Sequence, residues 1–358
     1  ALKSNSERSY KSIKMKSFFF TNIQYIGVIM KLVKAVLAVS LGAAIAASSM
    51  SAVQAKQITI GFSQIGAESE WRTANTNDVK AAAKAHNINL KFSDAQQKQE
   101  NQIKAIRTFI AQKVDLIGFV PIVATGWDNI LREAKRAKIP VLVMDRDLTV
   151  SDPSLYVAKI GTDSYTEGRK VFDWLDTYVH KNNVKPRNGG DKLNIVILEG
   201  TVGASATTGR GNGFNDALKE SPNKDMYNIL ASQTGDFTRQ KGQEVMESFL
   251  KSNPKDIDVL FAMNDDMALG AIQAIEAAGL KPAKDIIIVS VDGVKGIFQA
   301  MIEGKSNATV ECNPLQGDLF FSTAEKILKG ESVPKSVFVE EGVFPADTAK
   351  DVFPTRKY

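Results

Sequence analysis

The sequence has 358 residues, of which 44% are apolar and 24% charged, and its formal net charge is +5. This composition is ordinary for a globular protein with two or three domains, and it excludes a disordered chain, a collagen and a small disulfide scaffold. The positive charge is concentrated at one end, because residues 1–55 carry seven Lys or Arg and one Glu, and the rest carries 38 basic and 39 acidic residues. A body so close to neutral has no large positive field for phosphates, so we expect no nucleic-acid partner.

Residues 30–55 have the pattern of a secretory signal peptide. Two lysines in the first five positions precede an apolar run of 13 residues and a small, polar end that closes on Val-Gln-Ala. The pattern predicts cleavage after Ala55, whereas a membrane-spanning helix would need about 20 apolar residues. Residues 1–29 are interpreted as an upstream or vector-derived segment. Cys312 is the only cysteine, so no cysteine stands at the cleavage site of the signal peptide for lipid attachment. We therefore expect a periplasmic protein without a lipid anchor.

From residue 56 onward, short β-branched runs alternate with longer runs of helical period. The expected strands are, in chain order, 58–63, 89–94, 115–120, 140–145, 156–163, 193–200, 228–233, 258–265 and 285–293. The expected helices are 101–112, 127–137, 168–179, 240–251 and 267–279, and residues 180–192 are expected to form a surface loop. This alternation predicts an α/β protein with two doubly wound, Rossmann-like lobes of parallel strands.

Polar side chains follow most of the expected strands. They are Gln64, Asp94, Asp145, Arg146, Glu199, Asn264, Asp265, Asp266 and Asp292. Open α/β sheets bind ligands at the carboxyl ends of their strands, and this mixture of acceptors and forked donors suits sugar hydroxyls. Trp71 and Phe237, expected in strand-to-helix connections, would offer aromatic faces to the C–H surface of a sugar. The alternative is that each Asp or Asn caps a helix or forms a turn.

The sequence contains few residues that could form a metal site, a catalytic triad or a phosphate-binding loop. Two histidines, His86 and His180, and one cysteine predict neither a metal site nor a catalytic triad, and GRGNGF at 209–214 lacks the spacing of a dinucleotide loop. No cofactor or metal is therefore expected. Asp145 and Asp292 could be the acid and base of a glycosidase. Arg146 adjoins Asp145, however, and a nearby cation lowers the pKa of a carboxyl, whereas a general acid needs a raised pKa. We expect both carboxylates to be ionised at neutral pH and to accept hydrogen bonds from sugar hydroxyls.

Several segments resemble the galactofuranose-binding branch of the ribose- and galactose-type periplasmic proteins that supply ABC sugar importers. They are GFSQIGAESEWR, DAQQKQENQIKAIRTFIAQ, PIVATGW, GTVGAS, GDFTR and NDDMALGAIQAIEAAGLKPAKDI, and the likeness spans residues 56 to 350. The resemblance implies the type I periplasmic binding protein fold. Its N-terminal lobe would comprise 56–162 plus 313–341 and its C-terminal lobe 163–312 plus 342–358. Three hinge crossovers near Thr162, Cys312 and Glu341 would let the lobes close on one sugar.

By motif, the resemblance implies a set of ligand-binding residues. They are Trp71, Arg72, Asp145, Arg146, Arg210, Phe237, Asn264 and Asp292. Cys312 stands where ribose-binding relatives carry an amide, which argues against ribose. The expected ligand is a furanose, either galactofuranose or L-arabinofuranose, and Glu68, Glu70 and Arg72 are the candidates for reading the end at which these sugars differ.

The resemblance also implies a monomeric, non-enzymatic binder with two partners, a monosaccharide and an inner-membrane ABC permease. A sugar-processing enzyme is one alternative. A repressor-type sugar sensor is another, but it would need a helix-turn-helix segment where the leader lies.

Overall fold

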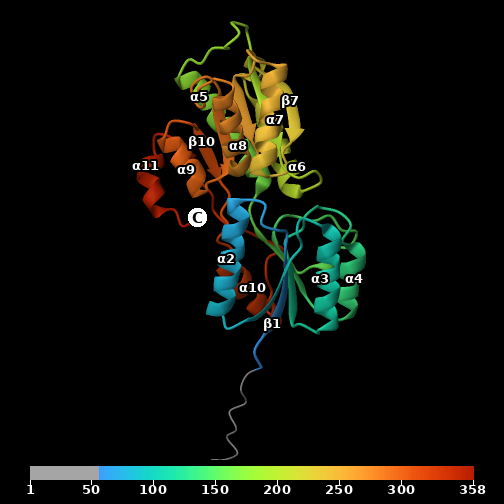
Figure 1. Cartoon of the computed structure of the whole chain (residues 1–358). Helices are drawn as coiled ribbons and strands as arrows, with labels where there is room; N and C mark the ends of the chain where they lie inside the picture. Colours follow the sequence, from blue (N-terminus) through green and yellow to red (C-terminus); the bar gives the residue numbers. More distant parts are fainter. Residues whose placement is uncertain (1–55) are drawn as a thin grey trace, which may run out of the picture. The chain divides into compact units, whose positions relative to one another are not determined.

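The computed structural model describes residues 56–358, of which Gln57–Tyr358 form one compact unit (Figure 1). The predicted signal peptide and its cleavage position lie outside the described residues. The strands are β1 Thr59–Gln64, β2 Asn89–Asp94, β3 Leu116–Phe119, β4 Val141–Asp145, β5 Ala158–Gly161, β6 Leu193–Glu199, β7 Tyr227–Thr234, β8 Val259–Ala262, β9 Ile287–Asp292, β10 Ala308–Glu311, β11 Ser336–Phe338 and β12 Val343–Pro345. The α-helices are α2 Glu70–Ala85, α3 Gln99–Ala111, α4 Asp128–Arg136, α5 Ser164–Lys181, α6 Ser205–Glu220, α7 Arg239–Ser252, α8 Asp265–Ala277, α9 Lys295–Ile302, α10 Gly317–Leu328 and α11 Ala349–Val352. Among these helices, none has both the length and the apolar character needed to cross a membrane.

Within the described residues, the strands form two six-stranded sheets, ordered β11-β5-β4-β3-β1-β2 and β12-β10-β9-β8-β6-β7. Strand pairing is parallel except between β10 and β12. The inner strands β3, β4, β8 and β9 are buried along their whole length, as parallel strands covered on both faces must be. The predicted doubly wound α/β fold is confirmed.

Helices cover both faces of the first sheet (Figure 1). On one face, α2 and α10 bury Val79, Phe320 and Phe321 in a core with Phe62 of β1. On the other face, α3 and α4 bury their apolar residues in a separate core that contains Phe119. The second sheet packs with α5 to α9 in one continuous cluster. The amphipathic period seen in the sequence therefore marks the sheet-facing side of these helices.

The chain passes between the two sheets three times. The first crossover, residues 162–163, joins β5 to α5, and the second, residues 312–316, joins β10 to α10. The third, residues 339–342, joins β11 to β12. The segments that form the site described below follow the carboxyl ends of β1 and β4 in one sheet and of β6, β7, β8, β9 and β10 in the other.

Five α-helices of the described residues were not predicted from periodicity: α2, α6, α9, α10 and the short α11. Helix α6 contains three glycines, which lower helix propensity, and α2 begins at Glu70 because the side chain of Ser69 accepts a hydrogen bond from the N–H of Arg72 at 3.1 Å. Trp71 therefore lies in the first turn of α2, and its predicted place in a strand-to-helix connection is wrong. Phe237 lies in the loop between β7 and α7, as predicted.

Candidate functional site

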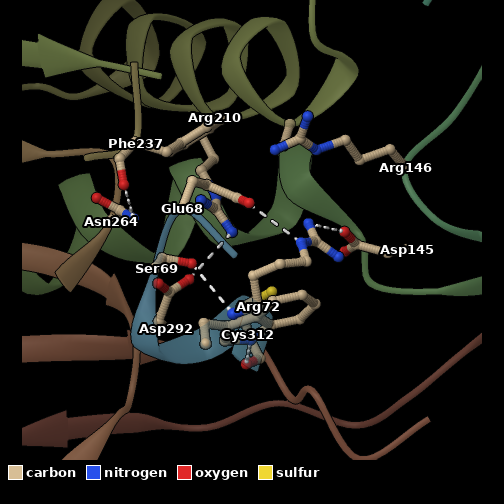
Figure 2. A pocket seen from close by; sticks show the side chains of 12 residues that line it. Glu68, Ser69, Arg72, Asp145, Arg146, Arg210, Phe237, Asn264, Asp292 and Cys312 are labelled. Carbon is tan, nitrogen blue, oxygen red and sulfur yellow. Dashed lines mark hydrogen bonds and ion pairs between the residues drawn. The ribbon is translucent and has the colours of Figure 1, made fainter. Parts of the chain in front are cut away.

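The strand ends of the two sheets line a partly open cavity, whose free volume, counted together with the solvent at its mouth, is about 310 Å³ (Figure 2). Its lining residues are Glu68, Ser69, Trp71, Arg72, Asp145, Arg146, Ala206, Arg210, Phe237, Asn264, Asp292 and Cys312. All eight sequence-predicted ligand residues are among them, although nothing in the fold itself tests their role in binding. Ser69 and Ala206 were not singled out in the sequence, since neither carries a distinctive charge or ring. Glu70, a candidate for reading the end of a sugar, does not line this cavity.

Three cavity residues have backbone conformations that L-residues seldom adopt. The φ angles are +65° at Asp145, +59° at Phe237 and +137° at Asp292. Non-glycine residues at such angles are concentrated at functional sites, where the surrounding fold holds them in place. Asp145 and Asp292 end β4 and β9, so the positive φ turns each chain sharply at the rim of the cavity. Sequence patterns give no sign of this feature.

Arg72 sits between two carboxylates on the α2 side of the cavity. Its Nη2 lies 2.8 Å from Oδ2 of Asp145, and its Nε lies 3.1 Å from Oε1 of Glu68. Burial alone would lower the pKa of Arg72, but the ion pairs with Asp145 and Glu68 raise it. The second oxygen of Glu68, Oε2, is buried and has no hydrogen-bond partner among the described residues. The Glu68 carboxylate therefore retains an acceptor beside the cavity.

Arg146 is the least satisfied of the cavity arginines. Nη1 donates to the carbonyl of Ile122 at 3.0 Å, and no other guanidinium hydrogen bond of Arg146 occurs within residues 56–358. Its guanidinium lies 5.1 Å from the ring centroid of Phe237. Burial, followed by the neighbouring charge of Arg72, lowers the pKa of Arg146 to about 10. It still carries its charge at neutral pH and presents unused donors to the cavity.

Arg210 is held from several sides. Nε lies 2.7 Å from Oε2 of Glu167, Nη1 donates to the carbonyl of Met263, and Nη2 lies 3.7 Å from Oδ1 of Asp292. Glu167 was not predicted as a site residue, because it lies in α5, outside every strand end.

Glycines let α5 and α6 approach closely enough for the Glu167 to Arg210 pair. A Cβ atom added at Gly168 would lie 2.1 Å from the carbonyl oxygen of Arg210, and one at Gly213 would lie 2.0 Å from that of Tyr165. The segment 209–214 is thus a helix-packing surface within α6, in agreement with the prediction that it does not form a phosphate loop.

Burial and nearby charges shift the pKa of Asp292 in opposite directions. Burial raises its pKa well above the usual range, Arg210 lowers it, and Asp265 and Asp266 raise it further. The net direction is upward, toward the protonated form. The physical reason is full burial beside other acids, with Arg210 shared with Glu167.

Other strand-end residues hold the loops in place. Asn264 caps α8, with Oδ1 3.0 Å from the N–H of Met267, and its Nδ2 donates to the carbonyl of Phe237 at 3.1 Å. Asp265 accepts from the N–H groups of Gly293 and Val294 at 2.7 and 2.9 Å, which fixes the turn after Asp292. For these residues the capping and turn interpretation is also correct.

One group of side chains in the described part of the chain has the composition of a metal site. Donor atoms of Glu167, Cys312 and Glu341 lie within 4.8 Å of one another. Sequence reasoning missed this group because its members come from three distant segments and include no histidine. The guanidinium of Arg210 already neutralises Glu167, so a metal cation would meet a like charge there.

Comparison with known proteins places the chain in a family. A model of the periplasmic binding protein domain matches residues 60–332. The galactofuranose-binding protein YtfQ of Escherichia coli is 47% identical over 317 residues, which cover 88% of this chain and 96% of that protein.

Two solved structures are similar over 84% of this chain and 95% of their own. The periplasmic component of the arabinose ABC transporter of Shewanella, bound to α- and β-L-arabinofuranose, has a TM-score of 0.78 and 48% identity. A protein of Mycobacterium smegmatis in complex with β-D-fucofuranose has a TM-score of 0.79 and 48% identity. The chain thus belongs to the periplasmic binding protein family and is similar to its galactofuranose-binding members, as the sequence motifs indicated.

Proposed function

We propose that this protein is the substrate-binding component of an ABC sugar importer and binds one monosaccharide in the cavity between its two sheets. The observation that carries the proposal is the cavity itself. It combines guanidinium donors, carboxylate acceptors and the faces of Trp71 and Phe237, which is the mixture that sugar hydroxyls and C–H surfaces need. The proposed ligand contacts are Trp71, Arg72, Asp145, Arg146, Arg210, Phe237, Asn264 and Asp292.

The proposed sugar is in its furanose form, either galactofuranose or L-arabinofuranose. Three similar proteins support this, because their names or descriptions mention galactofuranose, L-arabinofuranose and β-D-fucofuranose. The two proposed sugars differ by one exocyclic hydroxymethyl group. Glu68 is the candidate for reading that group, because Oε2 is a buried acceptor without a partner.

Binding is proposed to close the lobes 56–162 plus 313–341 and 163–312 plus 342–358 about the three crossovers. Contacts across the cavity mouth are consistent with a closed form. The N–H of Glu70 donates to Oδ2 of Asp266 at 2.7 Å, and the N–H of Ala124 donates to the carbonyl of Gly203 at 2.8 Å. Closure would exclude water from the ligand's hydrogen bonds and so strengthen them.

The cellular setting follows from the same proposal. The protein is exported by the signal peptide at 30–55, cleaved after Ala55, and delivers its sugar to an inner-membrane permease as a monomer. Its family membership supports a periplasmic site of action.

A sugar-processing enzyme is the alternative that one observation favours. A glycosidase needs one carboxyl that stays protonated near neutral pH, and burial moves the pKa of Asp292 in that direction. The proposed binding function needs no such acid. Incubation with aryl furanosides and measurement of released sugar separates the two, because a binder releases none.

Calorimetric titration of the purified protein against L-arabinose, D-galactose, D-ribose and D-glucose tests the proposal. We expect saturable 1:1 binding of L-arabinose or D-galactose. Tight binding of ribose or glucose without a response to the other two would overturn the furanose assignment, and no binding of any sugar would overturn the function.

A further inference from the structure

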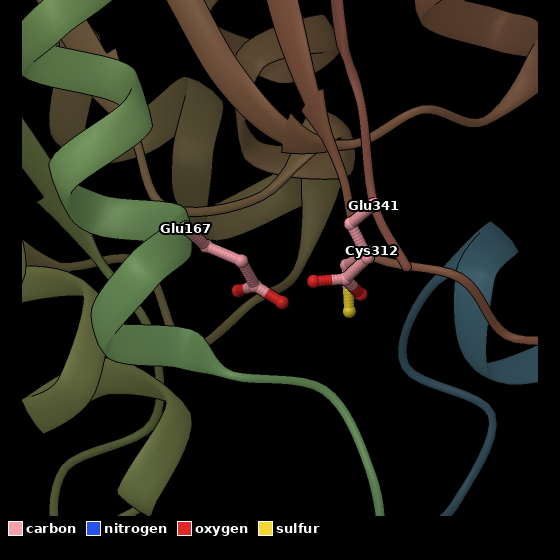
Figure 3. A group of neighbouring side chains, drawn as sticks. All are labelled: Glu167, Cys312 and Glu341. Carbon is pink, nitrogen blue, oxygen red and sulfur yellow. The ribbon is translucent and has the colours of Figure 1, made fainter. Parts of the chain in front are cut away.

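The second and third crossovers, and the start of α5 just after the first, contribute side chains to one largely buried cluster (Figure 3). Glu167 lies in the first turns of α5, after the first crossover, while Cys312 begins the second and Glu341 lies in the third. Figure 3 shows the carboxyl groups of Glu167 and Glu341 directed toward each other. The cluster therefore joins Glu167 to two residues that lie more than 140 positions later in the sequence, at the point where the two sheets are connected.

The hydrogen-bond partners of the two carboxyls leave one oxygen unexplained. Oε2 of Glu167 accepts from Nε of Arg210 at 2.7 Å, but Oε1 is fully buried and accepts from no N–H or O–H group in the described residues. Oε1 of Glu341 accepts from the N–H of Asn313 at 3.1 Å. A buried oxygen that lacks a donor destabilises the folded state, so a donor for Oε1 of Glu167 is to be expected.

The charges around the pair identify the donor. Two ionised carboxylates facing each other in a buried site repel, so one of them takes up a proton. Burial, followed by the charge of Glu167, raises the pKa of Glu341 to about 10, while Glu167 has the guanidinium of Arg210 to stabilise its charge. Two other charged groups contact this segment. Lys170 of α5 donates to the carbonyl oxygen of Glu341 at 2.7 Å and not to its carboxyl, and Oε2 of Glu311 accepts from the N–H of Gly342 at 3.2 Å.

We propose that Glu341 is protonated and donates a hydrogen bond to Glu167, and that this pair is a positioning device that aims Arg210 at the ligand cavity. The inference rests on the proposed sugar-binding function for its consequence, although not for the proton itself. Neither Glu167 nor Glu341 lines the cavity, so both act through Arg210.

The geometry of Arg210 explains why the proton matters. With Glu341 neutral, one negative charge at Glu167 holds Nε, and Nη2 remains 3.7 Å from Asp292 at the cavity. A second negative charge at Glu341 would draw the guanidinium toward the crossovers and away from Asp292. It would also drive Glu167 and Glu341 apart, and with them the first and third crossovers.

A metal ion is the competing occupant of the cluster. It would need Cys312 as a thiolate, but burial raises the pKa of this thiol well above its usual range. It would also place a second positive charge beside the guanidinium of Arg210, which already pairs with Glu167. A proton satisfies the free oxygen without either change.

Sugar affinity in three variants tests the positioning role, with L-arabinose and D-galactose as the probes. Glu341→Gln supplies a neutral amide donor to Glu167 and keeps an oxygen for Asn313, so we expect a Kd within about twofold of wild type. Glu341→Ala removes the donor and should weaken binding at least tenfold. Glu340→Gln makes the same substitution at the adjacent, exposed position and should leave binding unchanged. A Gln variant as weak as the Ala variant, or an Ala variant as tight as wild type, would overturn the inference.

An infrared measurement tests the proton without any ligand. The difference spectrum of wild type minus Glu341→Gln at pH 7 should contain the C=O stretch of a protonated carboxyl, and the difference spectrum with Glu340→Gln should not. Absence of that band means that Glu341 is ionised and the inference is wrong. If wild type binds neither sugar, the proposed function fails, and the infrared band still decides this inference. Circular dichroism of each variant establishes that a loss of binding is not a loss of fold.

Discussion

At the scale of single residues, the cavity is defined by side chains whose backbone is held in unusual conformations. Asp145, which pairs with Arg72, ends β4 with a φ of +65°. Asn adopts such angles more readily than most residues, which makes Asp145→Asn a substitution that changes charge with little change in shape.

Asp145→Asn should weaken sugar binding about tenfold to a hundredfold, since a hydrogen bond to a charged group contributes about 1.5 to 3 kcal/mol. The substitution also leaves Arg72 with Glu68 as its remaining carboxylate partner. Titration calorimetry gives the change in Kd. Asp94→Asn is the matched control, because Asp94 also ends a strand but is exposed and does not line the cavity. Equal affinity in the Asp145 variant and wild type would place the ligand elsewhere.

At the scale of helices and strands, close helix contacts bring charged residues together. The α5 and α6 backbones meet at glycines, and this approach places Glu167 of one helix against Arg210 of the other. A second pairing, between α2 and α10, is made by His86, whose ring nitrogens lie 2.9 Å from Asp318 and 3.0 Å from Glu325.

Gly168→Ala should both destabilise the protein and weaken sugar binding. Its Cβ would lie 2.1 Å from the carbonyl oxygen of Arg210, so α6 has to move. Overpacking of this kind costs about 1 to 3 kcal/mol. Gly211→Ala, in the same helix pair, meets only the end of the Met263 side chain at 3.4 Å and should be neutral or slightly stabilising. Denaturant unfolding of the two variants checks the difference, and an equal effect of both would show that close approach is not what Gly168 provides.

His86→Gln should lower the melting temperature more at pH 5.5 than at pH 9. The hydrogen bonds to Asp318 and then Glu325 raise the pKa of His86 in the folded protein. A raised pKa means that the stabilising contribution is complete below the unfolded value of about 6.5 and is lost as the pH rises through the folded value. His180→Gln is the control, since it replaces the other histidine of the chain at the exposed end of α5. Equal losses at both pH values would contradict a role for the charged form.

At the scale of the whole molecule, the chain connects the two sheets through three short crossovers. Hydrogen bonds across the cavity mouth form further, non-covalent contacts between the two sides. Such an arrangement allows a few backbone angles to change while each sheet and its helices stay intact.

Small-angle X-ray scattering should show a smaller radius of gyration with saturating L-arabinose or D-galactose than without sugar. Closure brings together pairs such as Asp147 and Ser205, whose N–H and Oγ lie 2.8 Å apart. A sugar that does not bind in the titration serves as the control and should leave the profile unchanged. Identical profiles with and without a bound sugar would remove closure from the mechanism.

The sequence by itself determined the features that depend on neighbouring residues. Buried β-branched runs and amphipathic periods are local, and they predicted the alternation of strands and helices and hence the two parallel sheets. The rule that ligands bind at the carboxyl ends of parallel strands, together with the family motifs, then selected eight residues that the fold brings to one cavity. Glycine-rich α6 escaped prediction because its stability comes from packing against α5, which no local pattern records.

Only the tertiary structure decided the features that depend on distant segments or on burial. Residues 167, 312 and 341 meet because the chain crosses between the sheets three times, and the raised pKa values of Asp292 and Glu341 come from burial among other acids. Desolvation and Coulomb interactions depend on distances through space, which sequence separation does not give. The strand ends could therefore be predicted to form a site, whereas the protonation of its acids and the residues that position Arg210 could not.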